Sequence, residues 1–313
     1  MKLGVVMDPI ETINFKKDST LAMMIEAQDK GHEIFYMTPD SLFINSGVAF
    51  SNMANIEVRN NPSDWFSLGE TSPMNLSHLD AILMRQDPPF NSEYIYNTYV
   101  LEMASRLGVH VFNNPRSLRD CNEKVFATEF PQCCTKHLVT SKKELLKDFV
   151  EEHKDTVIKP LDGMGGASIF RLKNSDPNLS VILETITNHF TQKVMIQEYI
   201  PEILEGDKRI LVINGKPMGA AIARIPAQGE LRGNLAAGAS AVAKSLSDRD
   251  LWICEQVAPA LVEKGLLLVG LDIIGDYLTE VNVTSPTCFK EYKDLCDIDV
   301  AKIFIESVEA LTL

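Results

Sequence analysis

The sequence predicts an α/β protein whose N-terminal part is a doubly wound parallel sheet and whose remainder mixes antiparallel strands with helices. Three features indicate this class. Short apolar runs alternate with helix-like segments over residues 1–121, which is the pattern of strand–helix–strand units. A glycine-rich loop joins two strand-like runs at 156–171. A strong hairpin signal, Asn214-Gly215, lies between two further apolar runs.

The N-terminal elements follow from hydrophobic patterning. Short apolar runs predict strands at 2–7, 32–37, 79–85 and 109–113. Helical spacing predicts helices that end at Gly31 and Gly108, and helical character continues at 116–130. The stretch from 38 to about Pro73 is polar and irregular and predicts no element. A domain boundary is expected near Cys121.

The later elements alternate less regularly. Helices are predicted at 138–153, 178–190, 247–264 and the C-terminus, and strands at 193–202, on both sides of Asn214-Gly215, at 266–276 and at 277–283. The loop at 226–244 is long, rich in small residues and without periodicity. A loop of that length inside a compact domain is usually functional or disordered.

Composition excludes several function classes. The formal net charge of -13 argues against a nucleic-acid partner, because phosphate backbones select for surplus lysine and arginine. The N-terminal apolar run is too short for a signal peptide, and no apolar stretch approaches the roughly 20 residues of a membrane helix, so a cytoplasmic protein is expected. Six cysteines without a CxxC motif and six histidines without metal-binding spacing argue against a zinc site and a disulfide framework.

The loop at 156–171 is a candidate phosphate clamp. Backbone N–H groups of Gly163, Gly165 and Gly166 can close on an anion without steric cost, and Lys159 can add a positive charge. The segment matches neither the P-loop nor the dinucleotide fingerprint. An ordinary glycine-rich hairpin is an equally good interpretation of this loop alone.

Asp272, Glu280 and Asn282 form a second candidate site, for a hard divalent cation. Glu280 and Asn282 lie two residues apart on one predicted strand, so their side chains share a face, and Asp272 lies on the preceding strand. Oxygen donors converging across a hairpin suit a cation such as Mg²⁺. The alternative is a solvated polar face of an edge hairpin.

Basic residues near loops and strand ends form a third set. Each alone is more simply a solvated surface charge. Arg224 is different, because it ends an otherwise apolar strand, where a buried guanidinium requires an anion. Together with Mg²⁺ these residues would neutralise a triphosphate; they are Lys124, Lys159, Lys208, Arg209, Arg224 and Arg232.

Several segments together resemble bacterial glutathione synthetase, a family of ATP-grasp ligases. They follow in colinear order over nearly the whole chain: RQDPPF (85–90), SLRDCNEKVFATEF (117–130), IKPLDGMGGASIFR (158–171), GDKRILV (206–212), ARIPAQGELRGNLAAG (223–238) and VGLDIIGDYLTEVNVTSPTC (269–288). The resemblance implies a doubly wound N-terminal domain (1–121), then an ATP-grasp fold of two α+β subdomains, one with the glycine clamp (122–203) and one with the metal site and a lid loop (204–313).

The resemblance also implies residue roles. ATP would be bound by Lys124, Lys159, Gly165, Gly166, Gln197, Glu198, Tyr199, Ile200 and Asp207. The metal ligands would be Asp272, Glu280 and Asn282. Lys159, Arg209 and Arg224 would stabilise the transferred phosphoryl group. The peptide substrate would be held by Arg85, Arg232, Asn234, Ser285 and Thr287.

A few positions depart from the family pattern. The family commonly has GGRG after the NLAA tetrapeptide, whereas this chain has Gly238-Ala239-Ser240-Ala241, so one arginine is missing from the lid loop. Gln86 and Asn91 stand where lysine and aspartate are frequent, and Glu198 stands where asparagine is frequent. None of these changes touches the expected cation ligands.

The activity implied by the resemblance is ATP-dependent ligation of γ-glutamylcysteine to glycine through an acyl phosphate. Two Mg²⁺ ions are expected, with Mn²⁺ as a possible substitute, and the loop at 226–241 would be a lid that excludes water. A homotetramer is the family's usual assembly. Two alternatives stay open: another ATP-grasp carboxylate–amine ligase, and a non-catalytic nucleotide-binding protein on the same fold.

Overall fold

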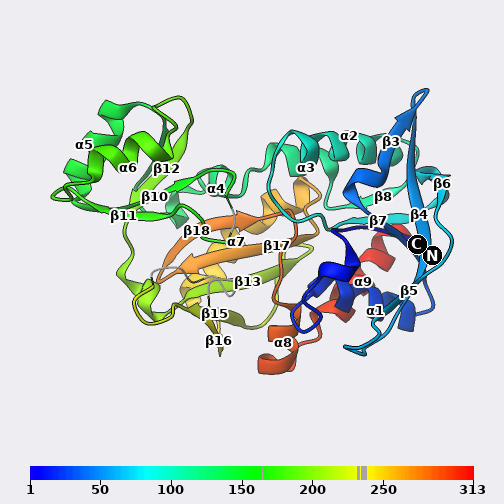
Figure 1. Cartoon of the computed structure of the whole chain (residues 1–313). Coiled ribbons are helices and arrows are strands. Elements are labelled where there is room, and N and C mark those ends of the chain that lie inside the picture. Colours follow the sequence, from blue (N-terminus) through cyan, green and yellow to red (C-terminus); the bar gives the residue numbers. More distant parts are fainter. Residues whose placement is uncertain (164, 231–232, 234–237) are drawn as a thin grey trace.

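A computed structural model describes residues 1–163, 165–230, 233 and 238–313. The described residues form three sheets, one in each of the ranges 1–121, 122–203 and 204–313 (Figure 1). The domain boundaries themselves stay a prediction. No helix in the described part of the chain is long and apolar enough to cross a membrane.

The N-terminal sheet contains the predicted parallel strands. Its strands β2 (Glu33–Met37), β1 (Lys2–Val6), β7 (Ala81–Met84) and β8 (His110–Phe112) lie side by side in that order and pair in parallel. Val5 packs in one cluster with residues of α1 (Ser19–Asp29), whereas Val6 packs in another with residues of α2 (Ser92–Arg106). Successive side chains of a strand are therefore buried on opposite faces of the sheet, as expected for a doubly wound fold.

The prediction that the stretch from 38 to about Pro73 contains no element was wrong. This polar stretch contains β3 (Leu42–Asn45), the long β4 (Val48–Val58), β5 (Phe66–Leu68) and β6 (Ser72–Asn75), and β4 pairs antiparallel with β2, β3, β5 and β6. Along β4, buried residues such as Met53 and Ile56 are interrupted by polar ones such as Asn52 and Asn55. The run has no long apolar core of its own, so pairing with β2 decides its conformation.

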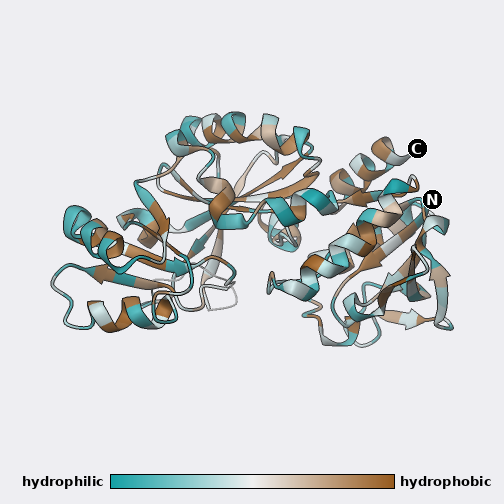
Figure 2. Cartoon of the chain, turned by 90° about the horizontal axis from the view of Figure 1, so that it is seen from above, coloured by the Kyte–Doolittle hydropathy of each residue, from teal (hydrophilic) through white to brown (hydrophobic). Residues whose placement is uncertain are grey.

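The central lobe consists of residues 136–198. Its antiparallel sheet has the strand order β11 (Phe170–Lys173), β10 (Asp155–Pro160), β12 (Val194–Glu198), β9 (His137–Thr140). Helices α5 (Lys143–His153) and α6 (Leu179–Ile186) cover it, and their buried residues form a cluster separate from the rest of the protein. Figure 2 shows the lobe projecting at one end of the molecule. We call everything outside the lobe the body.

The C-terminal sheet is antiparallel, with the path β16 (Ser240–Lys244), β15 (Ala221–Ile225), β13 (Asp207–Ile213), β17 (Leu268–Ile274), β18 (Tyr277–Asn282). The predicted hairpin is confirmed, because Asn214 and Gly215 both have positive φ and join β13 to β14 (Lys216–Pro217). The predicted helix is α7 (Asp248–Glu263), which begins with a capping box at Ser247.

The last two helices return to the N-terminal part. Helix α8 (Phe289–Cys296) and helix α9 (Val300–Thr312) contact α1, and α9 also contacts β8. His32 Nε2 lies 2.7 Å from Glu309 Oε1, and the N-terminal amino group lies 3.2 Å from His32 Nδ1. The two chain ends therefore lie close together (Figure 1). Two short helices, α3 (Pro115–Asp120) and α4 (Glu123–Ala127), connect the N-terminal sheet to the lobe.

Candidate active site

A cavity of about 650 Å³ opens between the central lobe and the body. The lobe contributes β10, the glycine loop and β11, whereas the body contributes β13, β17, β18 and the segment 284–287. Most of the predicted site residues line it: Lys124, Lys159, Gly165, Gly166, Gln197, Tyr199, Ile200, Asp207, Arg209, Asp272, Glu280, Asn282, Ser285 and Thr287. The phosphate clamp and the cation site, predicted separately, thus face one space.

Three described residues of the predicted site are not among those lining the cavity. Glu198 turns away from it, because its carboxylate lies 2.9 Å from His153 Nδ1 and accepts the backbone N–H of Lys136 at 3.2 Å. Arg85 is buried and donates to Thr20 Oγ1 and to the carbonyl of Pro286. Arg224 is buried behind the cavity wall among carboxylates. Arg232 and Asn234 lie outside the described residues.

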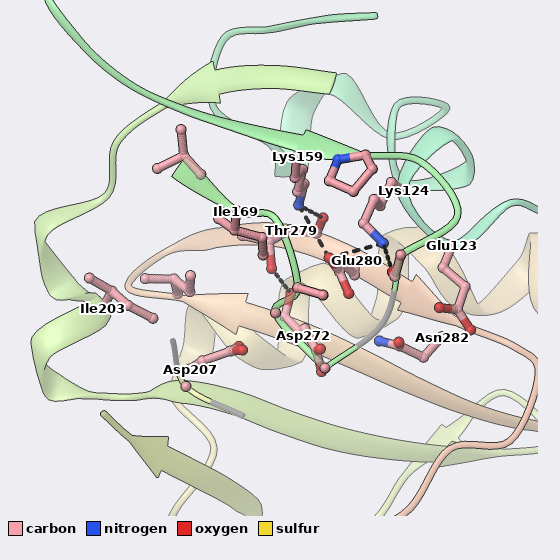
Figure 3. A pocket seen from close by; sticks show the side chains of 18 of the residues that line it. Glu123, Lys124, Lys159, Ile169, Ile203, Asp207, Asp272, Thr279, Glu280 and Asn282 are labelled. Carbon is pink, nitrogen blue, oxygen red and sulfur yellow. Dashed lines mark hydrogen bonds and ion pairs between the residues drawn. The ribbon is translucent and has the colours of Figure 1, made fainter. Parts of the chain in front are cut away.

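Two lysines converge on Glu280 where the lobe meets the body, Lys159 from the lobe and Lys124 from α4 of the body (Figure 3). Lys159 Nζ lies 3.4 Å from Glu280 Oε1 and donates to the carbonyl of Thr279 at 3.2 Å. Lys124 Nζ lies 3.7 Å from Glu280 Oε1 and donates to the carbonyl of Gly163 at 2.9 Å. Burial acts to raise the pKa of Glu280, but the ammonium groups of Lys124 and Lys159 outweigh it and lower the pKa below its ordinary value.

Burial lowers the pKa of Lys159, the lysine of the clamp, because it disfavours the charged ammonium form. The Lys124 ammonium also lowers this pKa, whereas the Glu280 carboxylate raises it. Two cationic groups share one carboxylate here. An added polyanion such as a triphosphate would give both lysines further partners.

The glycine loop has the backbone that a phosphate clamp needs. Gly165 and Gly166 have φ of +65° and +78°, a region that other residues rarely adopt. A Cβ atom on Gly165 would meet nothing within 4 Å, so backbone conformation and not space explains the glycine there. Met164, between Gly163 and Gly165, lies outside the described residues.

Asp272 is held by two arginines. Arg209 makes a two-pronged contact with it, with Nη2 donating to Oδ2 at 2.9 Å, and Arg224 Nη2 lies 2.9 Å from the same oxygen. Burial alone would raise the pKa of Asp272, yet the two guanidinium groups lower it well below its usual range. Arg224 also pairs with Asp207, whose pKa is nevertheless raised by burial. The two guanidinium groups therefore hold Asp272 in place and favour its ionised form.

The three predicted cation ligands fit a divalent metal. Asp272 and Glu280 are direct cross-strand neighbours on β17 and β18, and Asn282 pairs with Gly270 two positions further along. The amide of Asn282 donates to the Gly270 carbonyl at 3.2 Å, which orients its oxygen as an acceptor. The described residues contain no cluster of three or more His, Cys, Asp or Glu side chains that could hold a metal. A cation here would use two carboxylates, one amide and oxygens of a ligand.

Several cavity residues escaped the sequence reasoning. Glu123, the first residue of α4, accepts a hydrogen bond from Thr284 Oγ1 at 2.7 Å, and burial raises its pKa. Asp87 accepts a hydrogen bond from Ser285 Oγ. Arg171 lines the cavity from β11. The only sequence signals were the position of Glu123 next to Lys124 and that of Asp87 in the DPPF turn.

The cavity has a charged end and an apolar end. The charged end holds Lys124, Lys159, Glu280 and Asp272, whereas Figure 3 shows Ile203 away from the lysines. Val157, Phe170, Ile200 and Ile274 also line it. A ligand with a polyanionic part and a flat, apolar part matches this division.

Two family models match the chain. The model described as the prokaryotic glutathione synthetase N-terminal domain matches residues 1–119, and the prokaryotic glutathione synthetase ATP-grasp domain matches residues 123–297. A glutathione synthetase of Pseudomonas aeruginosa is 54% identical over 310 residues, which cover 99% of this chain and 98% of the relative. One of Vibrio parahaemolyticus is 53% identical over 309 residues, with coverage of 99% and 98%.

Solved structures agree at the level of the fold. D-cycloserine synthetase DcsG superimposes with a TM-score of 0.71 at 13% identity over the whole of both chains. The ATP-grasp ligase PsnB, solved with a minimal precursor, Mg and ADP, gives 0.64 at 17% identity over 99% of this chain and 98% of that one. The predicted fold, a doubly wound domain followed by an ATP-grasp fold, is confirmed. With both family models matching along its length and relatives more than half identical, the chain belongs to the prokaryotic glutathione synthetase family.

Proposed function

We propose that this chain is a glutathione synthetase, which joins γ-L-glutamyl-L-cysteine to glycine with ATP and releases glutathione, ADP and phosphate. One observation carries the proposal beyond family membership. The phosphate clamp of the lobe and the oxygen donors of the body line the same cavity, with Lys159 Nζ 3.4 Å from Glu280 Oε1. A nucleotide triphosphate in this cavity would meet cationic, amide and carboxylate groups from both sides.

The first step activates the cysteinyl carboxylate of the dipeptide. One of its oxygens attacks the γ-phosphorus of ATP, the bond from that phosphorus to the β–γ bridging oxygen breaks, and ADP leaves. Lys124, Lys159, Arg209 and the backbone N–H groups of Gly165 and Gly166 would stabilise the charge on the phosphoryl oxygens, where most catalysis of phosphoryl transfer arises. The product is an acyl phosphate.

The second step forms the peptide bond. The neutral amine of glycine attacks the acyl carbon, the C–N bond forms, and phosphate leaves with the electrons of the C–O bond. The nitrogen loses one proton in this step, and we assign no residue as its acceptor. Arg224 touches Asp207 and Asp272, so its predicted catalytic role would be exercised through these carboxylates.

Family membership implies use of ATP and a divalent metal. We take the metal to be Mg²⁺, with two ions expected and Mn²⁺ as a possible substitute, held by Asp272, Glu280 and Asn282. When bound, the metal would neutralise charge on the phosphate oxygens. The placement of Asp272 and Glu280 as cross-strand neighbours that both line the cavity, with Asn282 two residues further along β18, supports this assignment.

The dipeptide would lie toward the segment 284–287. Ser285 and Thr287 line the cavity there, and Arg85 supports the segment by donating to the Pro286 carbonyl at 3.0 Å. The predicted substrate contacts of Arg232 and Asn234, the lid at 226–241, the cytoplasmic location and the homotetramer stay predictions.

The direct test is to identify the product by mass spectrometry after incubation with ATP, Mg²⁺, γ-glutamylcysteine and glycine. Glutathione with one ADP per product is the expected result. ADP release with other amines, but not with glycine, would instead identify another carboxylate–amine ligase. Nucleotide binding without ADP release for any amino acid of a substrate panel would favour the non-catalytic alternative.

A further inference from the structure

Arg171 forms a tightly held stack at the apolar end of the cavity. Its guanidinium carbon lies 3.5 Å from the centre of the Tyr199 ring, and both residues line the cavity. At this distance the guanidinium plane covers the aromatic ring, so the pair presents a flat, cationic surface. The resemblance assigned a nucleotide contact to Tyr199 but none to Arg171.

Asp155 fixes both members of the stack. Its carboxylate receives two hydrogen bonds from Arg171, with Nε donating to Oδ1 at 2.8 Å. Its backbone carbonyl accepts the N–H of Tyr199 at 3.1 Å. One residue at the start of β10 therefore holds the guanidinium by its edge and the tyrosine by its backbone. The orientation of the stack is set before any ligand arrives.

The position of the stack relative to the charged end of the cavity determines which part of a bound nucleotide it would contact. The lysines and carboxylates that suit phosphates lie around Glu280. Val157 is the cross-strand partner of Arg171, and the apolar lining residues Phe170 and Ile200 are the chain neighbours of Arg171 and Tyr199. A nucleotide that places its phosphates at the charged end would extend its base toward the apolar residues. A flat cationic surface there is complementary to the π-face of a purine.

We propose that Arg171, held by Asp155 and stacked on Tyr199, is a nucleobase-binding residue that contributes to ATP affinity through the base and not through the phosphates. The inference rests on the proposed function, because it takes ATP as the occupant of the cavity. It adds a base-binding residue to the site.

The simpler interpretation is a structural stack of the kind found elsewhere in the chain. Arg119 lies 4.3 Å from the centre of the Tyr99 ring, and Arg249 lies 4.2 Å from that of Trp252. Neither of these arginines lines the cavity, whereas Arg171 does. Arg249 therefore provides a matched control, an arginine stacked on an aromatic ring outside the site.

The test compares ATP with inorganic tripolyphosphate, which has the phosphates but no base. Binding of each to Arg171→Met, Arg171→Lys, Asp155→Asn and Arg249→Met is measured, with Mg²⁺, from the ligand-dependent rise in Tm. Arg171→Met is expected to weaken ATP binding about tenfold and to leave tripolyphosphate binding unchanged. The ATP affinities of Arg171→Lys and Asp155→Asn should lie between those of Arg171→Met and the native protein. The ATP affinity of Arg249→Met should equal that of the native protein.

Two results would overturn the inference: equal weakening of ATP and tripolyphosphate by Arg171→Met, or no weakening of either. A lower Tm without ligand does not affect the conclusion, because the ratio of the two affinities is compared within each variant. Failure of the proposed function is separately visible. The native protein would then form no glutathione, whereas failure of this inference alone leaves glutathione formation intact.

Discussion

The central lobe and the body are held together by different kinds of interaction. The N-terminal and C-terminal sheets share two clusters of buried side chains; Leu101 and Val281 belong to one, and Leu21 and Phe304 to the other. The lobe has a separate and smaller cluster, which includes Leu183. Its hydrogen bonds to the body include those from Lys159 to Thr279, from Lys124 to Gly163 and from Asn122 to Leu161.

This difference indicates how the site can work. Because the body buries apolar surface between its two sheets, separating them would expose that surface to water. The lobe keeps its own core, and the bonds from it to the body described above are polar. A nucleotide that contacts Lys159 in the lobe and Glu280 in the body would tie the two together at the place where the chemistry occurs.

Glu280 should give the largest effect at this junction. Glu280→Gln removes the carboxylate that both lysines contact and that we assign to the metal, so ADP release with γ-glutamylcysteine and glycine should fall at least about a hundredfold. Steady-state ADP release is the measurement, with Tm as a check on folding. Glu306→Gln, on the exposed face of α9, is the control. Near-normal turnover of Glu280→Gln would contradict the metal assignment.

Core substitutions should separate the stability of the lobe from that of the body. Leu183→Ala in α6 and Leu101→Ala in α2 each remove a fully buried side chain, at a cost of about 2–5 kcal/mol. Hydrogen exchange followed by mass spectrometry should show protection lost in β9–β12 for the first variant and throughout the body for the second. Uniform loss of protection in both variants would mean that lobe and body unfold as one unit.

Lowering the pH should destabilise the lobe and the body, each through one carboxylate. This is the smallest of the expected effects. Hydrogen bonds from Arg171 lower the pKa of Asp155 in the lobe, and those from Arg119 and Arg106 lower the pKa of Glu102 in the body. The folded state thus binds fewer protons than the unfolded one, so this stabilisation is present above the unfolded pKa of about 4 and is lost as pH falls through the lower folded pKa.

Variants at these two positions provide the measurement. The Tm difference between native protein and Asp155→Asn, or Glu102→Gln, should be present at neutral pH and should vanish as pH falls below both pKa values. The stabilisation at stake is below about 1 kcal/mol for each pair, because both are partly exposed to solvent. A Tm difference that does not change with pH would show that the amide variants act through packing and not through ionisation.

Local patterns in the sequence alone predicted many strands and turns of this protein and part of its candidate site. The apolar runs predicted the parallel strands, Asn214-Gly215 predicted a hairpin, and the period of two along a strand placed Glu280 and Asn282 on one face. These features depend on neighbours in the sequence, and backbone sterics and side-chain alternation decide them. The family resemblance then supplied the ATP-grasp fold and a set of site residues, most of which line the cavity.

Tertiary structure decided what depends on distant partners. The strands of residues 42–75 exist because β4 pairs with β2, and Glu198 turns away from the cavity because His153 and Lys136 hold its carboxylate. Glu123 and Arg171 enter the cavity wall only when α4 is placed beside β18 and β11 beside β10. The physical reason is the same in each case: the partner that fixes the side chain is far away in the sequence, so no local pattern contains it.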